Sequence, residues 1–115
     1  MGAIDERNRR APFSNTGPHI GLCAPGTNIL STLPLKPSAY RPVDQTEYAA
    51  WNGTSMATPH VSAGAALVLS RHPNFDSKQV ADRLKDTATK LPKMKGKKET
   101  RDYGAGLLNL KDAVS

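Results

Sequence analysis

The chain has 115 residues, a mass of 12.3 kDa and a formal net charge of +6, which is the size of one small domain. Hydrophobic residues make up only 37% of it, which is thin for an independent core because small domains bury a smaller fraction of their surface. No apolar run reaches the roughly 20 residues that span a bilayer, and the single cysteine excludes a disulfide framework and a cysteine-based zinc site.

The positive charge raises nucleic acid as a partner, but its distribution argues against one. Five lysines lie between residues 90 and 98, together with Pro92 and Gly96 and without any aromatic residue. Proteins that bind single strands place aromatic side chains among their basic residues so that bases can stack. We therefore interpret this stretch as a solvated connector and residues 5–12 as a polar loop, and we predict no nucleic-acid partner and no membrane partner.

The first half of the chain predicts short strands joined by turns. Residues 2–4 are typical of the end of a strand, residues 20–24 predict a second strand that Pro25 and Gly26 end, and residues 28–31 predict a third. Between them, the sequence at 13–17 has the Asn and Gly that turns require. Residues 33–45 contain three prolines and are interpreted as a loop.

The second half predicts helices. The first spans about residues 55–70, and its interior is apolar or small nearly all the way round, so we expect it to be buried on most faces. Since 115 residues have little with which to cover such a helix, we expect missing sequence or a partner to cover it. The second spans about residues 77–87, with Asp76 as its cap and Gln79 placed to complete a capping box. A glycine-rich turn at 103–106 then leads into a short terminal helix, which gives a mixed α/β pattern.

The sequence from Asn52 to Val61, NGTSMATPHV, carries the chemistry. It places Ser55 where a glycine-bearing turn becomes a helix. Gly53 allows close approach of a substrate to the main chain, and the helix start offers unpaired N–H groups that favour negative charge. Pro59 has no N–H to give to the carbonyl of Ser55. From these residues alone, Ser55 is either a nucleophile or simply a helix cap.

The whole stretch resembles the nucleophile motif of subtilisin-like serine proteases, the subtilase family. Further segments resemble the family in the same order along the chain: Gly2–Asp5, Phe13–Gly17, Ala24–Gly26, Ile29–Thr32, His72–Pro73 and Tyr103–Asn109. The resemblance covers essentially all of residues 1–115 and corresponds to roughly the last two fifths of a subtilase catalytic domain.

The resemblance implies the fold and the chemistry. It implies an α/β fold with a doubly wound parallel sheet, in which a buried central helix starts at the nucleophile. Ser55 matches the acyl-forming serine, and its backbone N–H matches one donor of the oxyanion hole. The family hydrolyses peptide bonds with a serine–histidine–aspartate triad. The aspartate, the histidine and the oxyanion asparagine belong to segments that would precede Met1.

The three histidines of the chain do not provide an obvious base. His60 lies about 140° around the helix from Ser55, and His72 lies some 25 Å along it, at about 1.5 Å per residue. His19, in a turn, has no aspartate to pair with. We therefore expect no complete triad and no hydrolysis of peptides by this chain alone, since a serine without a base is a weak nucleophile.

Three other positions have two interpretations each. Asp5 matches a place where some relatives contribute to a weak cation site, but we favour a solvated loop carboxylate. Trp51 either shapes the cleft floor near Ser55 or packs against the sheet, and we favour packing. Cys23 is expected to be a buried, inert thiol. We predict no metal or cofactor in this chain, although calcium is compatible with full-length relatives.

The leading hypothesis is thus a serine endopeptidase whose chain supplies Ser55, acts on peptide or protein substrates, and pairs with the N-terminal part of the catalytic domain. The alternative is a non-catalytic subtilase remnant, or half of a split protease, that binds a partner chain. Secretion is plausible by resemblance, although the N-terminus does not have the pattern of a signal peptide.

Overall fold

The computed structural model describes residues 1–36 and 47–115. In chain order, its elements are β1 (Gly2–Ile4), β2 (Cys23–Pro25), β3 (Ile29–Thr32), β4 (Tyr48–Trp51), α1 (Thr54–Arg71), α2 (Ser77–Asp86), the 3-10 turn η1 (Pro92–Met94) and α3 (Leu110–Ala113). Most of the predicted loop at 33–45 lies outside the described residues. Among the described helices, none combines the length and apolarity that a membrane span requires.

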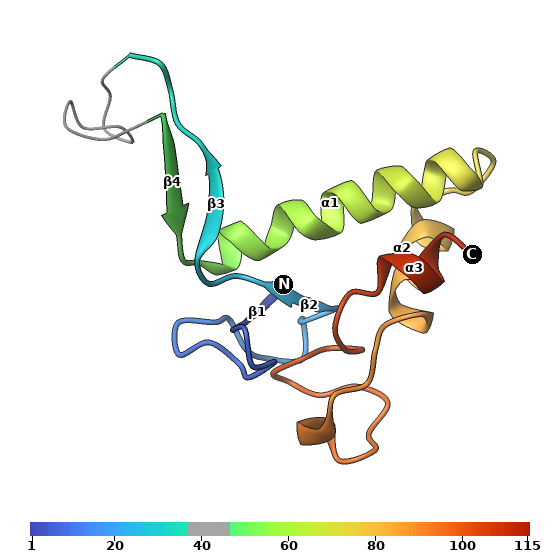
Figure 1. Ribbon diagram of the computed structural model, residues 1–115. Helices are drawn as coiled ribbons and strands as arrows, with labels where there is room; N and C mark the ends of the chain where they lie inside the picture. The colour runs from blue at the N-terminus through green and yellow to red at the C-terminus, as the bar shows by residue number, and fades with distance from the viewer. Residues whose placement is uncertain (37–46) are drawn as a thin grey trace.

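A small sheet lies at the centre of the molecule (Figure 1). Strands β1 and β2 run parallel, with Gly2 opposite Cys23, and single bridges add Arg10 beside β1 and Leu107 beside β2. The strand at 2–4 was predicted correctly, whereas the predicted strand at 20–24 is shifted, because pairing with β1 begins only at Cys23 and continues through Pro25. Within the described residues, β1 and β2 are the only parallel pair of strands, so the doubly wound sheet is represented here by a small part.

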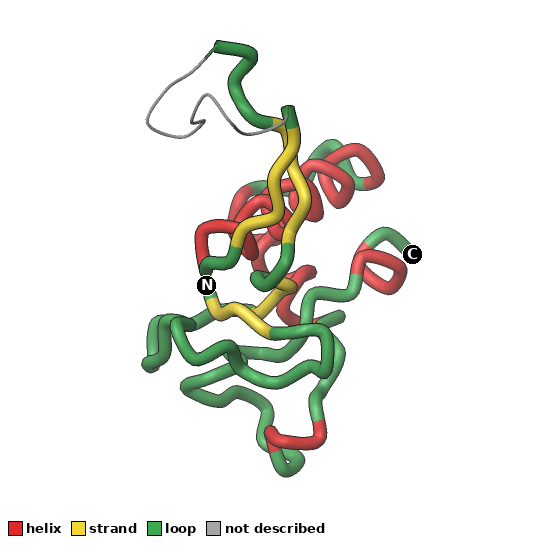
Figure 2. Tube along the Cα trace, turned by 60° about the vertical axis from the view of Figure 1, so that its left-hand side comes forward, coloured by secondary structure: helices red, strands yellow, loops and turns green. Residues whose placement is uncertain are grey.

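Strands β3 and β4 form an antiparallel hairpin that projects from the body of the molecule beside the start of α1 (Figures 1 and 2). Strand β4 was not predicted from the sequence, because its two central alanines have little preference for strands. Pairing with β3 makes it a strand, and the first pair of the hairpin, Ile29 with Trp51, lies just before the motif at 52–61.

Helix α1 crosses the small sheet and contacts β1, β2, α2 and α3. One side of it is buried, at Ala57, Gly64 and Val68, and Gly64 lies where the leucines of α2 and the C-terminal segment approach. Much of the rest of its circumference is open: Ala63, Ala66 and Ser70 are exposed, and Leu67 and Leu69, on either flank of Val68, are 48% and 42% exposed. The described residues thus cover this helix from one side only, and the prediction that missing sequence or a partner covers its other faces stays a prediction.

Helix α2 begins with the predicted capping box: the Asp76 side chain accepts a hydrogen bond from the Gln79 N–H, and the Gln79 side chain accepts one from the Asp76 N–H, both at 2.8 Å. The residues after α2 return beneath the sheet. There Leu91 and Met94 are buried with Ile4, Cys23 and Tyr103. The lysine-rich stretch is thus more than a solvated connector, since it supplies two residues to the core.

Candidate active site

Ser55 lies in the first turn of α1 and is exposed. The chain reaches it through β4, Asn52 and Gly53, whose backbone is extended, and then turns into the helix. Pro59 lies inside the same helix and cannot donate a hydrogen bond to the Ser55 carbonyl. Ser55 is therefore held at a rigid junction between a strand and a long helix, with its side chain open to solvent.

A turn at residues 26–28 fixes the segment before Ser55. The Gly53 N–H donates to the Gly26 carbonyl at 2.8 Å, and the Asn28 N–H donates to the Asn52 side-chain oxygen at 2.7 Å. Gly26 itself packs tightly: a Cβ there would lie 2.6 Å from the Ala3 Cβ and 2.8 Å from the Gly53 carbonyl oxygen. The central sheet, the turn and the motif are thus in direct contact, and this contact sets the position of Ser55.

The start of α1 offers unpaired donors. The Met56 and Ala57 N–H groups donate to the Gly53 carbonyl, whereas the N–H groups of Thr54 and Ser55 have no acceptor among the described residues. No side chain caps this end, and its first turn contains no acidic residue. These free N–H groups and the positive end of the helix dipole favour a negatively charged oxygen at this point. The interpretation of Ser55 as a side-chain cap has no support here, since its hydroxyl has no hydrogen-bond partner among the described residues.

Ser55 opens onto a hollow of about 420 Å³ between the β3–β4 hairpin and α1. Its lining is mainly apolar and comes from both elements: Ile29, Leu30, Ser31, Thr32, Leu33, Ala49, Trp51, Ser55, Met56, Pro59, His60 and Ala63. Trp51 is 37% exposed and belongs to this lining, so the cleft interpretation that we did not favour describes it better than packing against the sheet.

The histidines do not complete a catalytic pair. His60 lines the same hollow as Ser55, but its Nδ1 lies 3.0 Å from the Met56 carbonyl oxygen of its own helix. His72 stacks on Phe75 beyond the far end of α1, with ring centroids 4.5 Å apart. His19 is not part of the lining. Among the described residues, no histidine is hydrogen-bonded to Ser55.

Asp5 stabilises a loop. Its carboxylate accepts hydrogen bonds from the N–H groups of Arg7 and Arg9 at 2.8 and 2.9 Å and pairs with the Arg9 guanidinium at 2.8 Å. The Arg9 N–H, together with these other donors, lowers the pKa of Asp5 to about 2. The carboxylate is therefore more ordered than a solvated loop residue, and its oxygens already have partners. Among the described residues, no cluster of His, Cys, Asp and Glu is suited to hold a metal ion.

The prediction that Cys23 is a buried thiol is confirmed. The residue is fully buried and free, and burial raises the pKa of its thiol to about 12. A thiol with so high a pKa is almost entirely protonated near neutral pH, which makes it a poor nucleophile.

With this geometry in view, comparison with known proteins identifies the class. A sequence model described as the subtilase family matches residues 1–106. Over 114 residues the chain is 44% identical to a subtilisin of Bacillus pumilus and to subtilisin E of Bacillus subtilis, and 42% identical to subtilisin Savinase of Lederbergia lenta. These alignments cover 99% of this chain, but 36%, 26% and 36% of the respective relatives.

Solved structures agree. Fervidolysin of Fervidobacterium pennivorans, a keratinolytic enzyme related to subtilisin, superposes with a TM-score of 0.84 and 31% identity, over 98% of this chain and 18% of that one. MycP1 of Mycobacterium smegmatis superposes with a TM-score of 0.79 and 31% identity, over 99% of this chain and 28% of that one. The fold is that of part of a subtilisin-like α/β domain. The chain belongs to the subtilase family of serine peptidases and spans about a quarter to a third of the subtilisins it matches.

Proposed function

We propose that Ser55 is the acyl-forming nucleophile of a subtilisin-like serine endopeptidase, and that its backbone N–H is one donor of the oxyanion hole. One observation carries the proposal: at the start of α1, Ser55 has both its hydroxyl and its N–H without a partner among the described residues, at the edge of an open hollow. A serine that served only as a cap would use its hydroxyl to accept a hydrogen bond from the helix.

In this mechanism the Ser55 hydroxyl attacks the carbonyl carbon of a peptide bond while a base removes its proton. The carbonyl oxygen becomes negatively charged in the tetrahedral intermediate, and the Ser55 N–H donates a hydrogen bond to it. The protonated base then gives its proton to the leaving amine as the C–N bond breaks, which leaves an acyl group on Ser55. Water releases this group by the reverse sequence of proton transfers.

We propose that the base is a histidine, oriented by an aspartate, from polypeptide outside these 115 residues. His60 is a poor substitute because its Nδ1 already lies within hydrogen-bonding distance of the Met56 carbonyl. The apolar hollow between α1 and the hairpin, together with exposed Leu67 one helical turn beyond Ala63 of its lining, provides the surface against which such a segment would pack. The 115-residue chain alone is therefore expected to be inactive.

The same open surface favours a second candidate function. A chain that binds a partner through the hairpin and the exposed side of α1 would be a non-catalytic remnant or one half of a split protease. The two candidates differ in what happens when the partner is bound, since only a protease then cleaves a peptide through Ser55.

Hydrolysis by the full-length protein that carries this sequence tests the proposal. The substrate is a mixture of unstructured peptides, and the variants are Ser55→Ala and Ser62→Ala. Ser62 lies on the same helix, is exposed, and bonds only to the Thr58 carbonyl, at 3.3 Å, so its loss controls for the removal of a hydroxyl. We expect Ser55→Ala to abolish turnover and Ser62→Ala to retain it. Turnover that survives Ser55→Ala would refute the assignment.

A further inference from the structure

A second region of the surface is strongly basic and lies at the opposite end of the molecule from the hairpin (Figures 1 and 2). Between residues 93 and 101, the sequence has five cationic side chains and one acidic one. They are Lys93, Lys95, Lys97, Lys98, Arg101 and Glu99. We call the region formed by Lys93, Lys95, Lys97 and Arg101 the basic surface.

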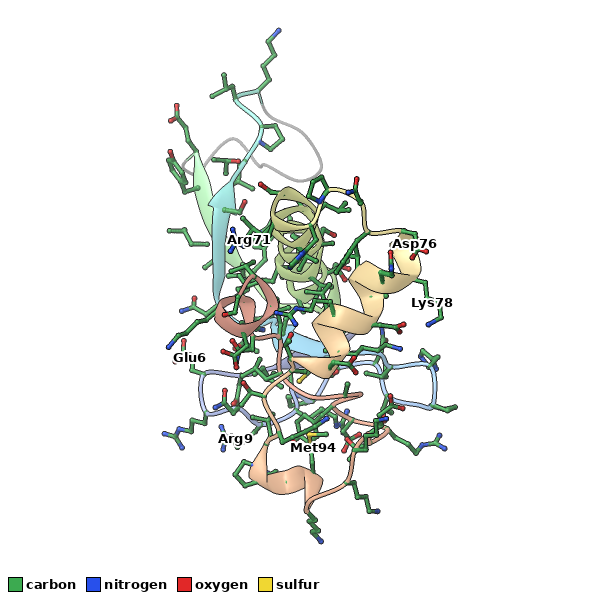
Figure 3. All side chains as sticks on the ribbon, turned by 90° about the vertical axis from the view of Figure 1, so that its right-hand side faces the viewer. Glu6, Arg9, Arg71, Asp76, Lys78 and Met94 are labelled. Atoms are coloured by element: carbon green, nitrogen blue, oxygen red, sulfur yellow. The ribbon has the colours of Figure 1, made fainter. Side chains whose placement is uncertain are left out.

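The backbone that carries the basic surface is fixed in place. Met94, the last residue of η1 and labelled in Figure 3, is 1% exposed and anchors this segment to the core. The Lys95 N–H donates to the Pro92 carbonyl and the Lys97 N–H donates to the Met94 carbonyl, both at 3.0 Å. A flexible tail would spread its charges over many positions, whereas this segment holds them together.

The neighbouring Lys90 strengthens this arrangement from within. Its ammonium group donates to the Lys98 carbonyl at 2.7 Å and also to the Ala105 carbonyl. On the other side, the Arg101 carbonyl accepts hydrogen bonds from the Gly17 N–H at 2.9 Å and from the Thr16 hydroxyl at 3.0 Å. Both ends of the segment are therefore tied to the body of the protein, and Lys90 is used for structure rather than for binding.

Two adjacent hollows of about 480 and 490 Å³ open between these side chains and share Lys93, Asp102 and Tyr103. Lys97 and Arg101 line one, and Lys95 lines the other. Their lining also includes Ile20, which is buried at 5% exposure, and Pro18, which is exposed and gives the cations an apolar neighbour open to a ligand.

Positive charge predominates in these hollows, because their linings together contain Arg10 and the four cations of the basic surface against two carboxylates, Glu99 and Asp102. Asp102 already pairs with Arg10, whose Nε lies 3.4 Å from it, and accepts a hydrogen bond from the Thr16 hydroxyl at 2.8 Å. Among the described residues, none of the four cations of the basic surface forms an ion pair. Like charges around the same two hollows repel one another, and an anionic ligand would relieve that repulsion.

We propose that the basic surface binds an acidic segment of polypeptide, one rich in Asp and Glu, at a site separate from the Ser55 hollow. Lysine ammonium groups are compact charges on flexible stems, which suit carboxylates spaced along a chain. Exposed Pro18 would contact an aliphatic part of such a segment. A nucleic acid fits less well, because Tyr103, the only aromatic residue of the two hollows, is 4% exposed and cannot stack on a base.

The test is direct binding of a short fluorescently labelled oligoglutamate, with oligoglutamine of equal length as the uncharged control. The full-length protein carries Ser55→Ala, so that the peptide is not cut and the result is independent of the proposed catalysis. The test variant changes Lys93, Lys95 and Lys97 to Gln. The control variant changes Lys36, Lys78 and Lys111 to Gln and thus has the same net charge. Thermal unfolding checks that both variants remain folded.

We expect oligoglutamate to bind, oligoglutamine not to bind, and added salt to weaken the complex. The test variant should bind roughly tenfold more weakly, since each exposed charge pair contributes a small amount, and the control variant should bind as the parent does. Equal weakening in both variants would show that only net charge matters and would overturn the proposal. Absence of oligoglutamate binding would overturn it as well. So would a single-stranded oligonucleotide of equal charge that binds more tightly than oligoglutamate and loses affinity in the test variant.

Discussion

The contact between Gly26 and Gly53 gives the most direct way to disturb Ser55 without touching it. In Gly26→Ala, the new Cβ would lie 2.6 Å from the Ala3 Cβ and 2.8 Å from the Gly53 carbonyl oxygen, whereas ordinary contacts begin near 3.4 Å. Neither neighbour can rotate away, because one is a Cβ fixed to the central strand and the other is backbone. The segment at Gly53 must therefore move by about 0.6 Å to restore an ordinary contact.

Two effects follow from that movement. Forced insertion of a methyl group into a packed site costs about 1–3 kcal/mol of the free energy of unfolding. Since a displacement of about 1 Å can cost roughly a hundredfold in rate, we expect kcat/KM of the full-length protein to fall roughly tenfold. Urea unfolding measures the first effect, and steady-state peptide hydrolysis measures the second.

Gly21→Ala is the matched control. Its Cβ would meet only the side chain of Lys85, at 3.3 Å from Cε, which is the flexible end of a long chain. The free energy of unfolding of this variant should lie within about 0.5 kcal/mol of the parent's, and its kcat/KM should be unchanged. If Gly26→Ala matched Gly21→Ala in both measurements, the reasoning that this turn positions Ser55 would be refuted.

Three further predictions concern other parts of the chain. Gly104 and Gly96 both have left-handed backbones, with φ of 57° and 76°, but a Cβ at Gly104 would lie 2.4 Å from backbone atoms of the neighbouring loop, and one at Gly96 would meet nothing within 4 Å. Gly96→Ala should therefore lower the free energy of unfolding, measured with urea, by about 1 kcal/mol, and Gly104→Ala should lower it by at least about 2 kcal/mol more. Equal losses in the two variants would contradict the close approach at Gly104. Because the pKa of Asp5 is lowered to about 2, its stabilising effect is complete above its unfolded value of about 4 and is lost as pH falls toward 2. The stability of Asp5→Asn should thus lie below that of the parent at neutral pH, and the difference should shrink through this acidic range; a constant difference would argue against the ion pair. Cys23 should resist an aromatic disulfide reagent at mildly alkaline pH until the protein is unfolded, and rapid labelling of the native protein would contradict its burial.

Local signals in the sequence predicted several elements well. Asp76 and Gln79 lie three residues apart before a helix, and both hydrogen bonds of the capping box are present. The strand at 2–4 and the helix from Thr54 to Arg71 also lie close to where the sequence placed them. These features depend on neighbouring residues, so a single sequence contains the necessary information.

Features that depend on distant contacts were harder to predict. Strand β4 exists because β3 pairs with it, and nothing in its two central alanines indicates that. Leu91 and Met94 join the core although lysines surround them in the sequence. The apolar composition of α1 predicted burial, yet the described residues cover it from one side only.

At the candidate site, too, features set by neighbouring residues were predictable and features set by distant contacts were not. The motif from Asn52 to Val61 singled out Ser55 without any structure, whereas the hollow beside it is formed by the hairpin and α1 together. For that reason the sequence could not decide the position of Trp51. Its placement opposite Ile29 at the base of the hairpin brings it into the lining. The turn at 26–28 could not be recognised either, because its hydrogen bonds to Asn52 and Gly53 join residues 24 or more positions apart.

Labelling with a fluorophosphonate tests the central claim most directly, because this reagent forms a stable bond only with a serine that is activated as a nucleophile. The full-length protein that carries these residues is treated with the reagent, and peptide mass spectrometry locates the modified residue. We predict a single modification on Ser55, its absence in Ser55→Ala, and no modification of the unfolded protein. Modification of another serine, or an unmodified Ser55 in protein that hydrolyses peptides, would contradict the account.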